Sequence, residues 1–177
     1  RGLGDVYKRQ IQFGTSMCYP ISSFGAHVAA RPRTSLKTRG NVAMCGTFGY
    51  ELDPRKLTDD EKAEVKQQIA DYRKYHCLVR EGDFYRLVSP TENDFYCAWE
   101  FVSPDKQEAM MTAVVMRQPE TRYCVQRLRG LDPKTYYQDE ETGTVYSGAM
   151  LMNAGLNLTR DVYEDGTSVT KHFKAVK

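Results

Sequence analysis

The sequence contains no long hydrophobic run and few of the residues that build common catalytic or metal centres. A membrane-spanning helix needs about 20 consecutive apolar residues, so we expect no membrane association from these 177 residues. The signatures GxGxxG and GxxxxGKS/T are also absent, which argues against a dinucleotide- or phosphate-binding loop. The histidines number only three, His27, His76 and His172, and they lie far apart in the chain.

Cysteine is present but sparse, with five residues scattered along the chain and no CxxC pair. Zinc sites need closely spaced ligands, and disulfide scaffolds are normally dense and even-numbered in cysteine. Reduced thiols in a cytoplasmic protein explain this pattern more simply. We therefore expect no metal site and a cytoplasmic location.

The first residue is not Met, and the opening segment RGLGDVYKRQ reads like the translation of a transposase adapter used in sequencing libraries. We interpret residues 1–10 as a non-native scar; the alternative is an unusual native N-terminal arm. On this interpretation the chain is the C-terminal remnant of a longer protein. Without the charged residues of this segment the net charge falls from +2 to zero, so the composition gives no argument for nucleic-acid binding.

Residues 11–81 alternate short strands with helices. Strand candidates occupy residues 26–30 and 47–53, and a helix candidate between them ends at Gly46. Residues 58–79 form the clearest helix, because Thr58 and Glu61 have the spacing of a capping box and apolar residues recur three and four positions apart. This order is typical of a (β/α) array with parallel strands. A complete eight-stranded barrel needs roughly 250 residues, so only part of one fits here.

From residue 82 onward, short runs rich in β-branched and aromatic residues alternate with turn sequences such as SPTEND, SPDK and DEETG. In FYCAWEFV, one set of alternating residues is expected to face a core and the other a wetter surface. Residues 82–177 are therefore predicted to form an all-β antiparallel sandwich.

A family resemblance rests on long ordered strings: IQFGTSMCYPISSFGAHVAARP, LKTRGNVAMCGTFGYELDPRKLTDDEKAEVKQQIADYRKY, GDFYRLVSP, RLRGLDPKTY and YSGAMLMNAGL. They are similar to the C-terminal part of bacterial α-galactosidases of the melibiase and raffinose-hydrolysing type, glycoside hydrolase family thirty-six. The resemblance covers essentially everything from residue 11 onward. It implies that residues 11–81 supply the last two strands and helices of a catalytic (β/α)8 TIM barrel, and that residues 82–177 form the C-terminal β domain. Within the first part it implies strands at 24–29 and 47–53, helices at 36–45 and 58–79, and the end of a preceding helix at 11–16.

The resemblance also implies a chemistry. The family consists of retaining hydrolases that remove terminal α-galactosyl residues from oligosaccharides such as melibiose and raffinose, using two aspartates and no metal or organic cofactor. The nucleophile lies in a K-W-D-x-N string and the acid/base in an S-D-N-T-D string, and neither string occurs in this sequence. We therefore expect no catalytic residue in this chain and no activity from it alone. The intact parent is a possible homo-oligomer.

Five residues are the remaining site candidates. His27, near the end of a strand, is the candidate substrate-binding residue, because strand ends line the catalytic mouth of a barrel; the alternative is a structural histidine that ties strand to loop. Glu51 and Asp53 either face the same mouth or lead into the loop before the long helix. Tyr50 is expected to pack in a core. Trp99 is either a sugar-stacking platform or, as its strand pattern favours, a core residue.

Two other functions stay open at this point. The rival from another class is a non-catalytic β module that binds carbohydrate or a partner surface, which an exposed row of aromatic residues on one sheet face would favour. Within the enzyme class, a raffinose-synthase-like transferase or an α-N-acetylgalactosaminidase is an alternative.

Overall fold

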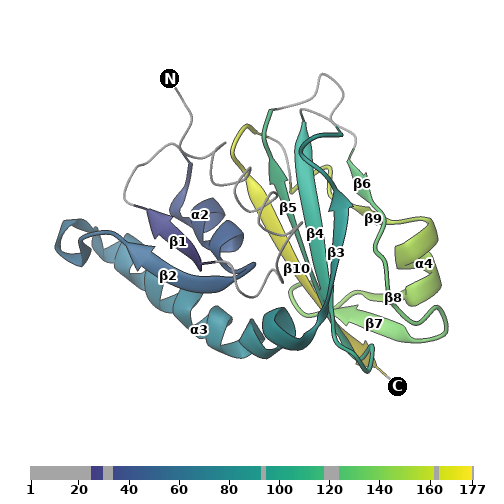
Figure 1. The fold of residues 1–177 in the computed structure, drawn as a ribbon. Coiled ribbons are helices and arrows are strands. Elements are labelled where there is room, and N and C mark those ends of the chain that lie inside the picture. The colour runs from purple at the N-terminus through teal and green to yellow at the C-terminus, as the bar shows by residue number, and fades with distance from the viewer. Residues whose placement is uncertain (1–24, 30–33, 93–94, 118–123, 162–163, 177) are drawn as a thin grey trace. The chain divides into compact units, whose positions relative to one another are not determined.

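In a computed structural model of the protein, residues 25–29, 34–92, 95–117, 124–161 and 164–176 are described. The predictions for residues 1–10 and 11–16 lie outside these ranges. The chain divides into two compact units, Arg1–Arg80 and Glu81–Lys177. The first unit is α/β and the second is mostly β; in Figure 1 the first runs from purple to teal and the second from teal to yellow.

The first unit contains a parallel strand pair with helices packed on one face. β1 (Gly25–Ala29) and β2 (Thr47–Glu51) pair in parallel, and α2 (Leu36–Ala43) forms the crossover that parallel strands require. The short 3-10 helix η2 (Pro54–Lys56) and the 23-residue helix α3 (Asp59–Glu81) follow. The predicted order of strand, helix, strand and long helix is therefore confirmed, with ends that differ by a few residues.

Helix α3 begins where the sequence places its capping box. The backbone N–H of Thr58 donates to Glu61 Oε2 at 2.9 Å, and the backbone N–H of Glu61 donates to Thr58 Oγ1 at 3.2 Å. These two bonds satisfy N–H groups that the first helical turn leaves without helix partners. The helix ends at Glu81, next to Gly82.

A buried polar residue, Gln68, joins α3 to the rest of the first unit. Its Nε2 donates to the carbonyl oxygen of Leu36 at 3.1 Å, and its Oε1 accepts the Tyr50 hydroxyl at 2.8 Å. Gly40 leaves the space for this amide, because a Cβ atom on Gly40 would overlap it. The apolar periodicity of α3 does not include Gln68, so the sequence pattern missed this contact.

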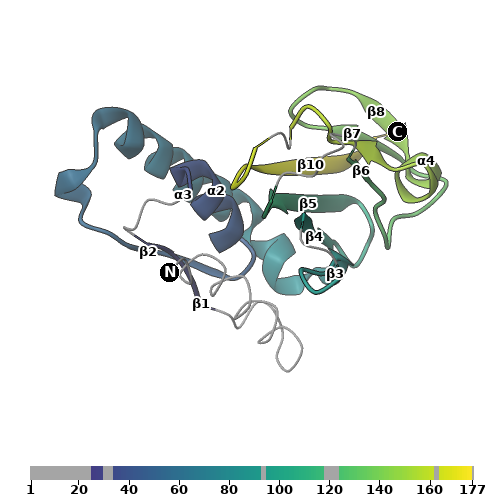
Figure 2. The same ribbon diagram turned by 90° about the horizontal axis from the view of Figure 1, so that it is seen from above.

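The second unit is built around a six-stranded antiparallel sheet, ordered β3-β4-β5-β10-β7-β8. A separate two-stranded ladder joins β6 to β9, and helix α4, which the sequence analysis did not predict, follows β8. Figure 2 shows β6, β7, β8 and α4 grouped on one side of β4, β5 and β10. The elements are β3 (Asp83–Val88), β4 (Tyr96–Val102), β5 (Glu108–Val115), β6 (Val125–Gln126), β7 (Tyr136–Asp139), β8 (Val145–Ser147), α4 (Gly148–Asn153), β9 (Leu156–Asn157) and β10 (Ser168–Val176).

The core of this unit lies between one face of the large sheet and the segments that follow β5. Sheet residues such as Met111 and Phe173 pack with Leu128, Leu151 and Leu158 from those segments. This two-layer antiparallel arrangement agrees with the predicted sandwich.

One expectation about the sheet is wrong. The alternation in β4 predicted one wetter face, but every residue of β4 after Tyr96 is buried. Both Glu100 and Phe101, which point to opposite faces, have an exposed fraction of 0%. A strand with neighbours on both sides and both faces covered loses the polar alternation that the prediction assumed.

Candidate functional site

Side chains of β1 and β2 separate onto two faces of the strand pair. Val28 packs with the helices, in one cluster with Leu36 and Ala43. Because successive strand residues point to opposite faces, His27 and Glu51 lie on the face that these helices do not cover. This places the candidate substrate-binding residue and a carboxylate on the same face of the unit.

His27 and Glu51 contact each other directly. Nδ1 of His27 lies 2.9 Å from Glu51 Oε1, and the two side chains are 43% and 62% exposed, so both are accessible to a ligand. Gly49 is opposite His27 in the register, and a Cβ atom on Gly49 would lie 2.8 Å from His27 Cδ2. The imidazole therefore packs over the bare backbone of Gly49, a feature that the sequence analysis missed.

Tyr50 and Asp53 have structural roles. The Tyr50 hydroxyl donates to Gln68 on the helix-covered face, and burial, with a further contribution from the Glu64 carboxylate, raises the pKa of Tyr50 to about 12. The predicted packing role of Tyr50 is confirmed. The Asp53 carboxylate accepts the backbone N–H and Nε–H of Arg55 at 3.0 and 2.9 Å, and these bonds lower the Asp53 pKa. Asp53 thus caps η2 at the start of the loop before α3, which agrees with its predicted loop position.

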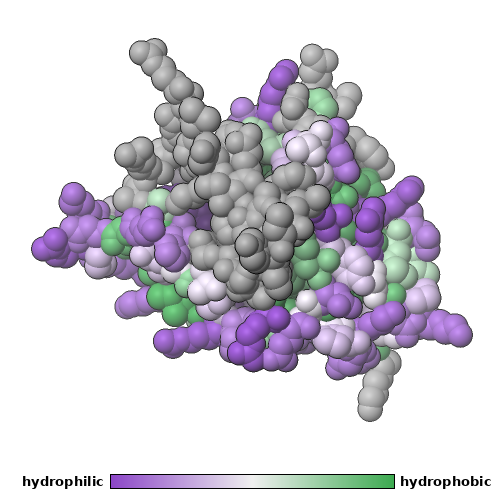
Figure 3. Space-filling view, viewed as in Figure 1, coloured by the Kyte–Doolittle hydropathy of each residue, from purple (hydrophilic) through white to green (hydrophobic). Residues whose placement is uncertain are grey.

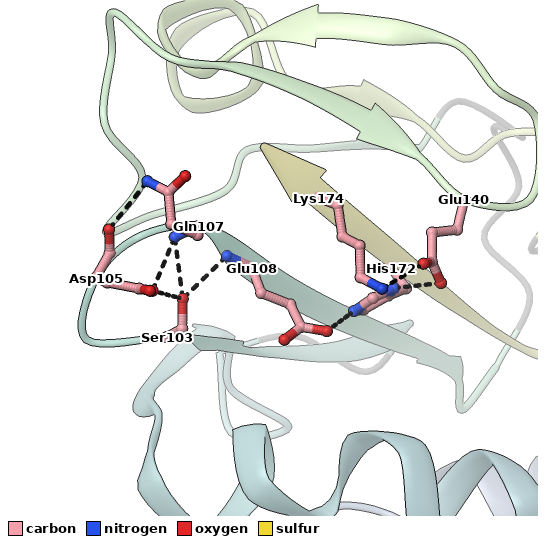
Figure 4. Close-up of polar contacts among 7 residues, drawn as sticks. All are labelled: Ser103, Asp105, Gln107, Glu108, Glu140, His172 and Lys174. Atoms are coloured by element: carbon pink, nitrogen blue, oxygen red, sulfur yellow. Dashed lines mark hydrogen bonds and ion pairs between the residues drawn. The ribbon is translucent and has the colours of Figure 1, made fainter. Parts of the chain in front are cut away.

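The second unit carries a histidine bound between two carboxylates (Figure 4). His172 on β10 places Nε2 2.5 Å from Glu108 Oε1 on β5, and Nδ1 2.7 Å from Glu140 Oε2 after β7. Lys174 Nζ contacts the other Glu140 oxygen at 2.8 Å. The hairpin before β5 positions Glu108, because Ser103 Oγ accepts the Glu108 backbone N–H at 2.9 Å. The histidine itself is buried, so this cluster connects three parts of the sheet rather than presenting a ligand site.

Several other candidates are not ligand sites in the described residues. Trp99 is 5% exposed, which confirms the core interpretation over the sugar platform. Cys45, Cys77, Cys97 and Cys124 are not in disulfide bonds, and Cys18 lies outside the described ranges. No group of three or more His, Cys, Asp or Glu side chains within those ranges is arranged to hold a metal ion. No described helix is long and apolar enough to span a membrane.

Comparison with known proteins identifies the family. A melibiase family model matches residues 4–82, and the model of the glycosyl hydrolase family 36 C-terminal domain matches residues 96–173. The bifunctional α-galactosidase/sucrose kinase AgaSK of Mediterraneibacter gnavus is 43% identical over 160 residues, which are 86% of this chain and 17% of the relative. The α-galactosidase AgaA of Geobacillus stearothermophilus is 48% identical over 160 residues, again 86% of this chain and 22% of the relative.

Solved structures give the same result. The galactosidase domain of AgaSK superposes with a TM-score of 0.90 and 40% identity, covering 97% of this chain and 24% of that one. AgaA bound to raffinose superposes with a TM-score of 0.88 and 44% identity, covering 97% and 24%. Both halves of the chain thus match models of one class of proteins, the glycoside hydrolases. Within that class the chain belongs to family 36, the melibiase family of α-galactosidases, and it spans about a quarter or less of the relatives it matches.

Proposed function

We propose that this chain is the C-terminal part of a retaining α-galactosidase, with residues 11–81 forming the last two strands and helices of its (β/α)8 barrel and residues 82–177 its C-terminal β domain. The observation that carries the proposal is the match of two consecutive family models in the order expected of one enzyme. The parallel pair β1–β2 with its crossover helix α2 supports the barrel assignment, because each strand of such a barrel is followed by a helix. The proposal includes the interpretation of residues 1–10 as foreign, although the melibiase match begins at residue 4.

The reaction of the whole enzyme requires two carboxyl groups about 5–5.5 Å apart, one as nucleophile and the other as acid and base. Neither family string that carries these aspartates occurs in this sequence. This chain therefore supplies part of the barrel and the C-terminal domain rather than the catalytic aspartates. The substrate of the complete enzyme is an α-galactoside oligosaccharide. Structures of AgaA hold raffinose and stachyose, which are sugars of this class. We place the enzyme in the bacterial cytoplasm.

Within this proposal His27 is a substrate-contacting residue. In a barrel the helices cover the outside, so the face of β1 and β2 that carries His27, Gly49 and Glu51 is the interior. Nδ1 of His27 lies 2.9 Å from Glu51 Oε1, so the carboxylate fixes the orientation of the imidazole ring. Imidazole and carboxylate groups both hydrogen-bond hydroxyl groups, so the His27–Glu51 pair is suited to a sugar.

The rival binding module has less support. It requires an exposed aromatic row, yet the large aromatic residues exposed among the described residues are Phe95, which precedes β4, and Tyr136 at the start of β7. In Figure 3 the hydrophobic residues on the side shown, outside the grey atoms, are interspersed with hydrophilic ones. The described surface therefore gives no specific argument for a carbohydrate-binding face.

The chain expressed by itself is expected to release no nitrophenol from p-nitrophenyl α-galactoside above a no-enzyme control. The physical reason is the absence of the carboxyl pair that forms and breaks the galactosyl–enzyme bond. A His27→Ala variant is the matched control for contaminating host enzyme, because both preparations should show the same background. Turnover that disappears when a residue between 11 and 177 is substituted would overturn this part of the proposal.

A further inference from the structure

Glu100 is a carboxylic acid buried in the middle of the second unit. It lies on β4 between β3 and β5, opposite Tyr85 on one neighbour and Met111 on the other, and its exposed fraction is 0%. Alternation along β4 puts it on the same face as Ala98 and Val102, which belong to the apolar core. An ionised carboxylate in such a position loses its hydration and needs compensating partners.

The partners that the structure provides are insufficient for a full negative charge. Oε2 of Glu100 accepts the backbone N–H of Arg129 at 2.9 Å. Oε1 is buried and has no hydrogen-bond partner in the described part of the chain. Ionised carboxylates have about four acceptor positions, so one bond leaves most of them empty.

The groups facing Glu100 come from three elements. Tyr85 approaches from β3, Arg129 from the segment 127–131, and Tyr137 from β7. Only Arg129 is cationic, and it is exposed, so water screens its charge. Burial raises the pKa of Glu100 from its ordinary value of 4.5 to about 8, while the Arg129 N–H and charge act in the opposite direction.

The same carboxyl group helps to attach a loop to the sheet. The segment 127–131 contributes Leu128 and Leu131 to the core. Its Gly130, at φ +74°, lies under the Tyr85 ring, where a Cβ atom would come within 2.5 Å of ring carbons. The bond from Arg129 to Glu100 is the polar contact at the centre of this attachment.

We infer that Glu100 is carried in the folded core as the neutral carboxylic acid while it joins β4 to the segment 127–131, and that its ionisation weakens the second unit because the charge is then buried without enough partners. This property is separate from the proposed enzymatic function and does not depend on it. In the unfolded chain the group ionises at its ordinary value, whereas in the folded chain it keeps its proton until about pH 8. Between these two values the folded state binds the extra proton, so stability falls as the pH rises.

The size of the effect follows from the proton count. One proton of difference increases the unfolding constant by up to about tenfold for each pH unit. The increase begins near pH 4.5 and levels off above about pH 8, where both states are ionised. Below pH 4.5 the group is neutral in both states and contributes no pH dependence.

The test is a carboxyl NMR titration of the full 177-residue chain labelled with 13C at the glutamate Cδ. We expect one glutamate resonance to titrate near pH 8 and the Arg129 amide resonance to follow the same curve. The late resonance should be absent in Glu100→Gln and retained in Glu164→Gln, a matched change at an exposed glutamate. Urea midpoints should fall between pH 5 and 8 in the unaltered chain and change less in Glu100→Gln.

Two results would overturn the inference. One is a titration in which every glutamate carboxyl of the unaltered chain ionises below about pH 6, within the ordinary range for this side chain. The other is a late resonance that persists in Glu100→Gln. If that variant does not fold, the Arg129 amide curve of the unaltered chain decides the assignment, because Arg129 is bonded to Glu100.

Discussion

Replacing Gly148 by alanine is expected to destabilise the second unit by about 3 kcal/mol, the upper part of the range for overpacking a close-packed site. Gly148 begins α4, and its N–H donates to the carbonyl oxygen of Thr135 at 2.8 Å. An added Cβ atom would overlap the carbonyl oxygen of Asp132 and lie 2.9 Å from its carbonyl carbon. It would also lie 3.1 Å from Cε2 of the fully buried Tyr137. Neither the backbone of Asp132 nor a packed aromatic ring can move aside cheaply.

The measurement is urea unfolding followed by circular dichroism, with the midpoint compared between Gly148→Ala and the unaltered chain. Met150→Ala is the control in the same helix, because Met150 is exposed and its truncation should cost less than about 0.5 kcal/mol. An unchanged midpoint for Gly148→Ala would show that α4 does not pack against the Asp132 backbone.

Replacing His172 by leucine is expected to cost about 2 kcal/mol, because it leaves the carboxyl groups of Glu108 and Glu140 close together without the ring that hydrogen-bonds both of them. His172 joins the two carboxyl groups through its ring nitrogens, with Nε2 2.5 Å from Glu108 Oε1 and Nδ1 2.7 Å from Glu140 Oε2. Both carboxylates keep partial access to water, with exposed fractions of 32% and 28%, so the loss stays below that for a fully buried pair.

A second substitution separates charge from packing. Adding Glu108→Gln to His172→Leu removes one of the opposed charges and should recover part of the loss of unfolding free energy. Lys174→Ala is the control, because Lys174 is half-exposed and its contact with Glu140 should contribute less than about 1 kcal/mol. If His172→Leu lowers the free energy of unfolding no more than Lys174→Ala does, the contacts that His172 makes between β5, β10 and the turn after β7 do not stabilise the second unit, which would contradict the prediction.

Local sequence signals predicted the first unit well. The Thr58 and Glu61 capping box fixes where α3 starts, because both of its hydrogen bonds join residues three apart in sequence. Gln68 shows where this kind of signal ends. Its burial depends on Gly40 and on contacts 32 and 18 residues away, and no periodicity within α3 records them.

In the second unit, too, local features were predictable from the sequence and long-range contacts were not. Turn chemistry and β-rich composition predicted its strands, but not the order in which they pair. Alternation along β4 shows which residues share a face with Glu100, but it does not show that this face is the core. A glutamate in the sequence suggests an exposed face instead. His172 meets Glu108 and Glu140 across 64 and 32 residues, so only the strand register brings the three together.

The candidate substrate-binding site also depends on contacts between residues that are far apart in the sequence. His27 and Glu51 are 24 residues apart, and their contact follows from parallel pairing of β1 and β2 in one register. The positions of His27 and Glu51 near the ends of predicted strands made both residues candidates. Nothing in the sequence indicated that Gly49 leaves room for the imidazole. The family strings, rather than any spacing of acids or histidines, indicated the chemistry.

The most direct test of the whole account is a chimera in which residues 11–177 replace the equivalent C-terminal stretch of AgaA from Geobacillus stearothermophilus, to which the chain is 48% identical. If these residues close the barrel and complete the β domain, the chimera should hydrolyse p-nitrophenyl α-galactoside and raffinose. We expect a turnover within about tenfold of AgaA, since about 1.4 kcal/mol of lost transition-state stabilisation corresponds to that factor. A chimera that folds like AgaA, as judged by circular dichroism and gel filtration, yet shows no turnover would contradict the account.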